Sequence, residues 1–209
     1  MARSKSSNRW LNEHFKDQYV QLAQKEGFRS RAVYKLQELD DKDKLFKPGQ
    51  HIIDLGAAPG GWSQWLSQTM QHRAKIIATD ILPMDALPDV TFIQGDFTEQ
   101  SVLDEILAVM DGDKADLVIS DMAPNMSGMD AIDQPKAMYL VELALDLAIN
   151  VLRKNGSFVC KAFQGAGFQE WHEMIRQNFS VVKSRKPKAS RARSREVYIV
   201  AKGFLGSDR

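Results

Sequence analysis

From residue 51 onward, short apolar runs alternate with helix-like stretches, and this pattern constrains the fold more than any other feature of the chain. The clearest helix-like stretches span 101–110 and 135–152. Such alternation predicts βαβ units, and hence a mostly parallel sheet covered by helices on both faces. The apolar runs that we expect to form its parallel strands are 52–55, 76–79, 90–94, 116–120 and 157–162.

Two further apolar runs, 179–183 and 197–201, are joined by a basic loop that has no room for a helix of ordinary length. We therefore expect them to pair like a hairpin, which makes one of them antiparallel. The fold class predicted for the chain is α/β, with seven strands, one of them antiparallel, and helices on both faces of the sheet.

The part of the chain before residue 51 divides into a tail and two helices. Residues 1–9 are rich in serine and basic residues, and we expect a flexible basic tail. Apolar residues recur at helical spacing over 10–25 and 30–43, with Ser30 as a plausible N-cap for the second helix. No linker or internal repeat interrupts the remainder, so residues 10–209 are predicted to form one domain.

The stretch 51–62 combines a short strand, a turn containing Gly56, Gly60 and Gly61, and the start of a helix over 62–70. A glycine-rich turn between strand and helix lets the backbone approach a ligand closely. The glycine spacing does not fit the G-x-G-x-x-G dinucleotide fingerprint, and the chain contains no G-x-x-x-x-G-K-[ST] phosphate loop. Both mismatches disfavour nicotinamide-dependent and nucleoside-triphosphatase functions.

Ionisable residues stand at or just after the ends of successive predicted strands, and Asp54 is predicted to end the first one. Because ligands bind beyond the carboxyl ends of strands in an open parallel sheet, we expect these groups to face one crevice. Asp80 is placed to accept hydrogen bonds from a ribose diol, Asp96 from an adenine amino group, and Trp62 could pack on an apolar or cationic part of the ligand. The pattern indicates an adenosine-bearing cofactor and leaves a nicotinamide dinucleotide open. The five groups are Asp54, Asp80, Asp96, Asp121 and Lys161.

Composition excludes several classes of protein. The single cysteine, Cys160, permits no intrachain disulfide, so a reducing cytoplasm is the expected location. The four histidines lack metal-ligand spacing, and we expect no metal site. No apolar run reaches the roughly 18 residues of a membrane span.

The net charge of +1 conceals a strong segregation. Residues 1–35 carry a net charge of +5 and residues 183–196 carry +6, which leaves −10 on the remainder. Two basic segments flanking an acidic domain favour a polyanionic partner. Arg29 and Arg31, together with the 183–195 loop, are the expected phosphate contacts. The loop residues selected as RNA-binding are Lys186, Arg191, Arg193 and Arg195.

Four segments of the chain resemble the FtsJ/RrmJ family of ribose 2′-O-methyltransferases. Residues 54–62, with the sequence DLGAAPGGW, resemble that family's S-adenosylmethionine loop. The resemblance continues through 120–128 (SDMAPNMSG), 161–165 (KAFQG) and 190–198 (SRARSREVY). It extends over nearly the whole chain, from the region of Ser30 to the last predicted strand, and we see no departure at a motif position.

The resemblance implies a Rossmann-like class I methyltransferase fold, S-adenosyl-L-methionine as cofactor and a Lys-Asp-Lys-Glu tetrad formed by Lys35, Asp121, Lys161 and Glu196. It also implies that Gly56, Gly60, Trp62, Asp80, Asp96 and Asp121 contact the cofactor. The implied substrate is the ribose of a uridine in the A-loop of bacterial 23S rRNA, within an assembled large subunit, methylated by a monomeric cytoplasmic enzyme that supports late assembly.

The implied reaction is in-line transfer of a methyl group to a ribose 2′-hydroxyl. Lys161 is the candidate to orient the hydroxyl and accept its proton, for which it must be neutral. Lys35 and a sulfonium favour its neutral form, whereas Asp121 and Glu196 oppose it. The segment 121–124 (DMAP) differs from the Asn/Asp-Pro-Pro-aromatic pattern of enzymes that methylate exocyclic base nitrogens. Three alternatives remain: another RNA substrate, a noncatalytic RNA-binding assembly factor and a nicotinamide-dependent enzyme.

Overall fold

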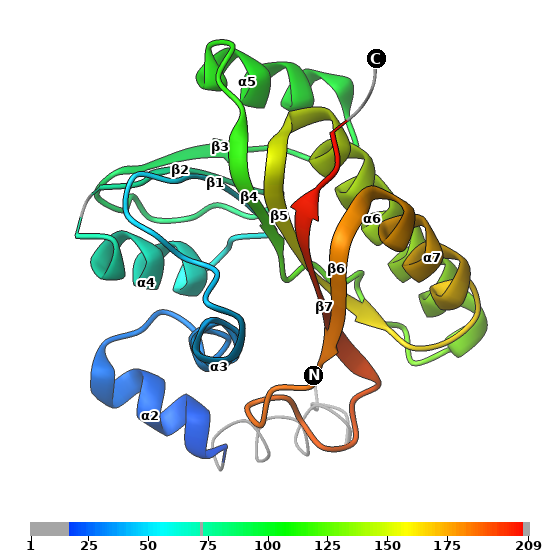
Figure 1. The fold of residues 1–209 in the computed structure, drawn as a ribbon. Helices are drawn as coiled ribbons and strands as arrows, with labels where there is room; N and C mark the ends of the chain where they lie inside the picture. Colours follow the sequence, from blue (N-terminus) through cyan, green and yellow to red (C-terminus); the bar gives the residue numbers. More distant parts are fainter. Residues whose placement is uncertain (1–16, 72, 207–209) are drawn as a thin grey trace.

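One seven-stranded sheet runs through the protein, in the order β3-β2-β1-β4-β5-β7-β6 (Figure 1). The structure is a computed structural model that describes residues 17–71 and 73–206. Strand β7 runs antiparallel to both of its neighbours, and every other neighbouring pair is parallel, which confirms the predicted mixed sheet. The strands are β1 (His51–Leu55), β2 (Lys75–Asp80), β3 (Val90–Gln94), β4 (Ala115–Ser120), β5 (Leu152–Phe163), β6 (Phe179–Arg185) and β7 (Glu196–Phe204).

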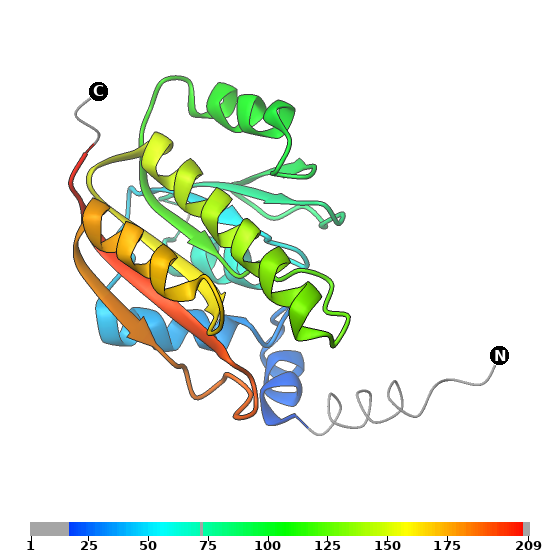
Figure 2. The same cartoon turned by 90° about the vertical axis from the view of Figure 1, so that its right-hand side faces the viewer.

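Helices cover both faces of the sheet, and each face has its own hydrophobic cluster. Helices α5, α6 and α7 cover one face (Figure 2), where Phe158 and Trp171 are fully buried. Helices α3 and α4 cover the other face, around Leu36 and Trp62. No helix in the described part of the chain has the length and apolarity to cross a membrane. The helices are α2 (Gln18–Glu26), α3 (Val33–Asp43), α4 (Gly61–Thr69), α5 (Gln100–Met110), α6 (Asp130–Val151) and α7 (Phe168–Asn178).

Three local predictions differ from the structure. Ser30 is not the N-cap of α3, because the cap position is Ala32; the Ser30 hydroxyl instead accepts a hydrogen bond from the Ala32 N–H, 3.1 Å away. Asp54 lies inside β1 instead of ending it. Helix α7 is absent from the predicted elements, because its buried residues, Trp171 and Ile175, form only a narrow stripe among charged neighbours.

The predicted tail, 1–9, and the first part of the helix predicted over 10–25 lie outside the described residues.

The register of β7 against β5 determines which side chains face α3. Lys161 of β5 lies directly opposite Tyr198 of β7. Since successive side chains of a strand point to opposite faces, Lys161 and Val159 share the α3 face, whereas Cys160 belongs to the cluster on the other face. Burial raises the pKa of the Cys160 thiol to about 12, so this cysteine is protonated and unreactive at neutral pH.

Helix α3 is pinned to the edge strand β6 by a bidentate ion pair. The Arg185 guanidinium donates to both carboxylate oxygens of Asp43, and each N···O distance is 2.7 Å. Burial opposes ionisation of Asp43, but the hydrogen bonds and charge of Arg185 and the charge of Lys183 outweigh it and hold the pKa of Asp43 below its usual range. The pair fixes α3 relative to the sheet. Its two residues lie 142 positions apart in the chain, so no local sequence pattern could predict it.

We predict that Asp43→Asn lowers the free energy of unfolding by about 1–3 kcal/mol at pH 7, because it removes a buried, charge-assisted pair. Chemical denaturation measures the change. The difference between variant and wild type should shrink as pH falls below the ordinary carboxyl range, since a depressed folded-state pKa stabilises only while the carboxylate is ionised. Asp41→Asn, at an exposed position of the same helix, is the matched control and should change stability little. Equal effects of the two variants would contradict the assignment.

Candidate active site

Lys161 and Asp121 meet at the carboxyl ends of β4 and β5. The Lys161 ammonium nitrogen lies 3.0 Å from Asp121 Oδ1 and also donates to the Asp121 carbonyl oxygen. The Tyr198 hydroxyl donates to the same Oδ1 at 2.6 Å. Because a lysine ammonium has three donor positions, two contacts with Asp121 leave one position for another group.

Lys35 and Glu196 form a second pair beside the first one. Lys35 points inward from α3 and is 7% exposed, and its Nζ lies 2.9 Å from Glu196 Oε1 at the start of β7. The Lys35 ammonium also lies 5.5 Å from the centre of the Tyr198 ring, within cation–π range. Tyr198 therefore touches both pairs, and the fold brings together the four residues predicted as a tetrad.

Opposite charges determine the protonation of the two acids. Burial by itself raises the pKa of Asp121, but the charges of Lys161 and Lys35 and the Tyr198 hydrogen bond outweigh it and leave that pKa lowered. The pKa of Glu196 is lowered in the same way, chiefly by Lys35 against burial. Burial, with Asp121 and Glu196 nearby, raises the pKa of Tyr198 well above its ordinary value. At neutral pH the site therefore holds two carboxylates and a phenol donor.

A cavity of about 340 Å³ adjoins Asp121 at the carboxyl ends of β1, β2 and β4. Gly56, Asp80 and Asp96 line it, as expected from the sequence. The Asp80 carboxylate accepts from the N–H groups of Ala58 and Leu82, both at 2.9 Å, which orients it and leaves lone pairs free for further donors. Asp96 is oriented by the Thr98 N–H, 2.9 Å from its Oδ1. The cavity thus offers acceptors where a ribose and an amino group would bind.

Asp54 supplies an unusual acceptor beside this cavity. Its Oδ2 accepts a hydrogen bond from Ser63 at 2.7 Å, but Oδ1 is buried and has no hydrogen-bond partner among the described residues. Burial, with the charges of Asp121 and Asp80 adding to it against the Ser63 bond, raises the pKa of Asp54 to about 7. Asp54 lines a smaller cavity of about 80 Å³ together with Gly56 and Asp121. A cationic ligand group fits this unpartnered oxygen, so the residues present suit a cofactor with an ammonium end.

Two residues predicted to contact the cofactor have other partners. Trp62 is 3% exposed, donates its indole N–H to the Ala32 carbonyl oxygen at 2.8 Å and belongs to the core beneath α3. It also lines the smaller cavity beside Asp54, so its contact with a cofactor stays a prediction. A Cβ atom at Gly60 would lie 2.8 Å from Met84 Sδ and 2.9 Å from Arg29 Nη1, which gives this glycine a packing role. Among the described residues, no cluster of three or more His, Cys, Asp and Glu could hold a metal ion.

Two residues that were not predicted from the sequence organise the site. Tyr198 could have been recognised, because it lies two residues after Glu196 and therefore on the same face of a strand. Asp133, at the start of α6, is 2% exposed and accepts from the N–H and hydroxyl of Ser127 and from the Gly128 N–H, all at 2.8 Å. It holds the loop after Asp121, whose first residues line the larger cavity and whose Met126 and Met129 are exposed.

Several residues predicted to bind phosphate already form hydrogen bonds or ion pairs within the protein. Arg29 donates to the carbonyl oxygens of Pro59, Asp85 and Ala86, and so ties the glycine turn to the loop after β2. Lys186 donates to the carbonyl oxygens of Ser194 and Glu196. Carbonyl partners leave the positive charges uncompensated, so a role toward phosphates stays a prediction.

Arg31 and Arg191 face Asp17, with N···O distances of 3.1 Å and 4.0 Å, and Arg195 pairs with Asp130 at 2.6 Å. These three residues therefore have carboxylate partners, which reduce their net contribution to a phosphate-binding surface. Arg193 also interacts within the protein. Together with the blue helices α2 and α3, the loop between β6 and β7 lies on one side of the sheet (Figure 1).

We predict that Asp54→Asn stabilises the protein at pH 8 by on the order of 2 kcal/mol, because it removes a buried carboxylate with one unpartnered oxygen. A raised carboxyl pKa means that wild-type stability falls as pH rises from about 4 to about 7, so the gain should vanish toward pH 4. Thermal or denaturant unfolding across this pH range measures it. Asp96→Asn, at a residue that lines the larger cavity, serves as control. A pH-independent gain for Asp54→Asn would argue against a buried charge.

Comparison with known proteins places these features in a family. The family model described as FtsJ-like methyltransferase matches residues 28–204. The chain is 62% identical over 206 residues to Ribosomal RNA large subunit methyltransferase E of Hahella chejuensis, covering 99% of this chain and 100% of that protein. It is 59% identical over 204 residues to the protein of the same name from Marinobacter nauticus, covering 98% and 99% of the two chains.

Solved structures agree with the fold. A putative ribosomal RNA methyltransferase from Plasmodium falciparum superposes with a TM-score of 0.78 at 30% identity, covering 86% of this chain and 100% of that one. Human methyltransferase-like protein 13, solved with S-adenosylhomocysteine, shares the fold alone at 13% identity and a TM-score of 0.54, over 85% of this chain and 81% of that one. The family model covers most of the chain and the relatives match it end to end, so this protein belongs to the FtsJ-like methyltransferase family.

Proposed function

We propose that this protein transfers a methyl group from S-adenosyl-L-methionine to the ribose 2′-hydroxyl of a uridine in the A-loop of 23S rRNA, and so supports late assembly of the large ribosomal subunit. The observation that carries the proposal is Lys161, held 3.0 Å from Asp121 at the edge of a cavity with acceptors for an adenosine. The names of the relatives support rRNA of the large subunit as substrate. The two lysines of the site, Lys35 and Lys161, suit a hydroxyl as methyl acceptor. RNA has a ribose 2′-hydroxyl and DNA lacks it.

The cofactor requirement follows from the family and from the residues present. S-adenosyl-L-methionine supplies an activated methyl group on a sulfonium. Asp80 would hold the ribose diol, Asp96 the adenine amino group and Asp54 the ammonium group of the amino-acid end. Each of these carboxylates has an unfilled acceptor position, and that of Asp54 is buried without a partner. Carboxylates also suit a sulfonium cofactor because its two positive groups need compensating charge.

Lys161 is the residue proposed to act on the substrate hydroxyl. Its position on β5 is fixed by two contacts with Asp121, which leave its third direction for the hydroxyl. A neutral Lys161 would accept the hydroxyl proton, and a charged one would orient the hydroxyl while water takes the proton. Asp121 orients Lys161 and is itself oriented by Tyr198. Glu196 would hold the buried Lys35 against the Tyr198 ring, on the same face of the sheet as Lys161.

The partner proposed for this reaction is large-subunit rRNA, encountered within an assembled subunit by a monomeric enzyme in the bacterial cytoplasm. The basic loop 186–195 supports an RNA partner because it is held rigidly beside the site: Glu38 accepts from the N–H groups of Lys188 at 2.7 Å and Ala189 at 2.8 Å. A preformed basic loop loses less conformational entropy when it binds a phosphate backbone. Arg29 and Arg31 lie between this loop and the glycine turn.

Two alternatives compete with this proposal. A nicotinamide-dependent enzyme would also use Asp80, but the family model and the absence of the dinucleotide glycine spacing disfavour it. A noncatalytic assembly factor would need neither Lys161 nor Lys35 in place, whereas both are buried and paired at the site. Maintaining buried, paired charges is costly without a function. A nicotinamide-dependent enzyme would be stabilised by a nicotinamide dinucleotide and not by S-adenosyl-L-methionine, which the melting temperature measures. A noncatalytic assembly factor would transfer no methyl group.

We predict that the purified protein, given S-adenosyl-L-methionine with a labelled methyl group, transfers label to large subunits from cells that lack this protein. Mapping should place the label as one 2′-O-methyluridine in the A-loop. Label on a base, or no label on RNA, would contradict the proposal. Transfer to protein-free rRNA and to assembled subunits, measured in parallel, decides which one is the substrate.

We predict that Lys161→Ala lowers kcat of methyl transfer by about 100-fold or more, the usual contribution of a positioned acid–base group, while folding and cofactor affinity persist. Lys35→Ala should also lose activity. Lys42→Ala, at an exposed position of the same helix α3, is the matched control for Lys35. Single-turnover assays measure the rate of methyl transfer, and calorimetric titration measures cofactor affinity. Near-wild-type transfer by Lys161→Ala would contradict the role proposed for Lys161.

We predict that Asp54→Asn, although it stabilises the unliganded protein, weakens binding of S-adenosyl-L-methionine by about tenfold or more, because the ammonium loses its buried counter-charge. Isothermal titration at pH 8 measures the affinity. Asp104→Asn, on exposed α5, should leave it unchanged. Unchanged affinity in Asp54→Asn would remove this residue from the cofactor site.

A further inference from the structure

The amino-terminal pole of the sheet, away from the proposed methyl-transfer site, carries a basic cavity of about 510 Å³. It lies among three segments: the link between α3 and β1, the beginning of β5 and the end of β7. Five cations line it and one acid, Asp116, accompanies them, for a net charge of +4. The cations are Lys44, Lys47, Arg153, Lys154 and Lys202. We call this site the polar basic cavity.

The charge of the polar basic cavity is largely unused within the protein. Arg153 pairs with Asp116, and Lys202 donates to the Asp43 carbonyl oxygen at 2.8 Å. Lys44, Lys47 and Lys154 are exposed and make no side-chain hydrogen bond or ion pair with the described residues. The polar basic cavity is therefore lined by three ammonium groups that have no counter-charge within the described part of the protein. Their mutual repulsion is unfavourable to folding.

The walls of this cavity are preorganised. Asp40 Oδ1 accepts from the N–H groups of Leu45 at 2.7 Å and Phe46 at 3.2 Å, and so fixes the turn that carries Lys44 and Lys47. The Gln50 side chain bridges the same turn, since it accepts from the Lys47 N–H at 2.7 Å and donates to the Leu45 carbonyl oxygen. Asp116 fixes the opposite side through Arg153. The cavity therefore presents its cations from a rigid frame.

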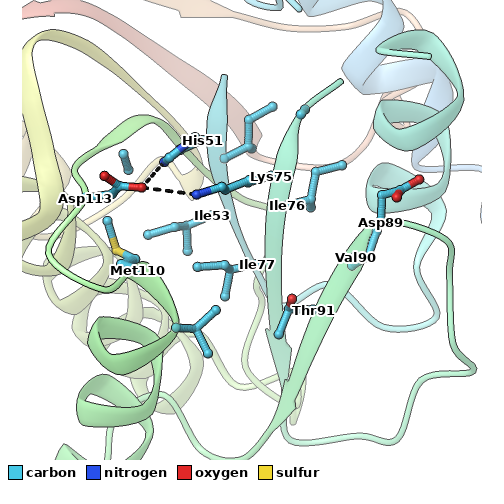
Figure 3. A pocket seen from close by; sticks show the side chains of 14 residues that line it. His51, Ile53, Lys75, Ile76, Ile77, Asp89, Val90, Thr91, Met110 and Asp113 are labelled. Carbon is cyan, nitrogen blue, oxygen red and sulfur yellow. Dashed lines mark hydrogen bonds and ion pairs between the residues drawn. The ribbon is translucent and has the colours of Figure 1, made fainter. Parts of the chain in front are cut away.

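A second cavity of about 510 Å³ at the same pole shows what ordinary charge pairing looks like (Figure 3). There, Asp113 Oδ2 lies 3.2 Å from Lys75 Nζ and 3.6 Å from His51 Nδ1, so its charges compensate one another. Asp89 adds a second acid to its rim. This cavity has no net positive charge, so of the two cavities the polar basic cavity is the one that suits an anion.

From this geometry we infer that the polar basic cavity binds the phosphate backbone of the substrate RNA, as a contact separate from the methyl-transfer site. The inference rests on the proposed function, because it takes the substrate to be a large RNA. Lys161 lies four regular strand residues beyond Ser157, or about 13 Å at strand rise, and Lys154 lies on the other side of Ser157, in the irregular start of β5. A ribosomal RNA extends far beyond the length of β5, so one molecule can reach both places.

Electrostatics favours RNA over other anionic partners at this place. The chain outside its two basic segments carries a net charge of −10, and an RNA strand passing over such a surface is repelled except where cations gather. The polar basic cavity belongs to that acidic remainder, yet it is positive. It thus gives the RNA a defined second anchoring point, which fixes its direction across the molecule without reading its sequence.

The test compares two triple variants with a control. Lys44→Gln/Lys47→Gln/Lys154→Gln removes three charges, and Lys44→Glu/Lys47→Glu/Lys154→Glu reverses them. Arg176→Gln, an exposed cation on α7 outside both sites, is compared with the single Lys154→Gln. Binding is measured across a salt series, both to assembled large subunits and to a protein-free rRNA fragment that contains the modified position and its flanking helices. Cofactor affinity and melting temperature serve as checks on folding.

The glutamine triple variant should reduce the slope of log affinity against log salt by about 2, since each lost phosphate contact removes roughly 0.7–0.9. The glutamate triple variant should bind the fragment about tenfold or more weakly at low salt, and Lys154→Gln should change the slope more than Arg176→Gln. Unchanged slopes overturn the inference. A loss confined to assembled subunits, with the protein-free fragment bound normally, also overturns it, because the partner would then be an acidic protein surface.

Wild-type methyl transfer separates this inference from the proposed function. If the wild type methylates the RNA and the triple variants bind it with an unchanged salt slope, only the second contact is wrong. If the wild type transfers no methyl group to RNA, the proposed function fails and the inference fails with it.

Discussion

The antiparallel pairing of β7 with β5 is the constraint on which the rest of the site depends. It sets Tyr198 directly opposite Lys161 and leaves Glu196, two residues earlier, on the face that α3 covers. A slip of one residue in this register would turn Lys161 or its partners toward the opposite face of the sheet. Lys161 reaches Asp121 because β4 and β5 are parallel neighbours and end at the same edge. Two pairings of opposite sense thus assemble the site.

Helix α3 completes the site because it is anchored at several points. Asp43 fixes its end to Arg185 of β6, while Glu38 holds the basic loop through two backbone N–H groups. Lys35 lies one and two turns before these anchors, on the buried side of the helix. The same helix therefore orients a candidate catalytic lysine and the loop proposed to contact RNA. A displacement of α3 would disturb both, so the position of this loop is coupled to the geometry of the ion pairs.

Local patterns predicted the sheet, and the strand-end acids predicted where its ligand site lies, because period and position are properties of short segments. Asp80, Asp96 and Asp121 do line one cavity. The sequence could not reveal that Arg29 is engaged by carbonyl oxygens, since its partners lie 30 to 57 residues away. The polar basic cavity could not be predicted for the same reason, because its cations come from three segments, 44–47, 153–154 and 202, that lie far apart in sequence. The sequence alone therefore did not show which residues, far apart in the chain, lie next to one another in the fold.

The buried charges of the candidate site are compensated unequally. Lys161 with Asp121 and Lys35 with Glu196 form two formally neutral pairs, so each desolvated charge has a counter-charge within 3.0 Å. Asp54 breaks this balance, because it is 1% exposed and one of its oxygens has no partner in the described residues. The unliganded protein therefore carries an energetic defect where a positively charged ligand group would remove it. Binding of such a ligand would relieve the cost of that desolvated carboxylate, which links cofactor affinity to the stability of β1 and its glycine turn.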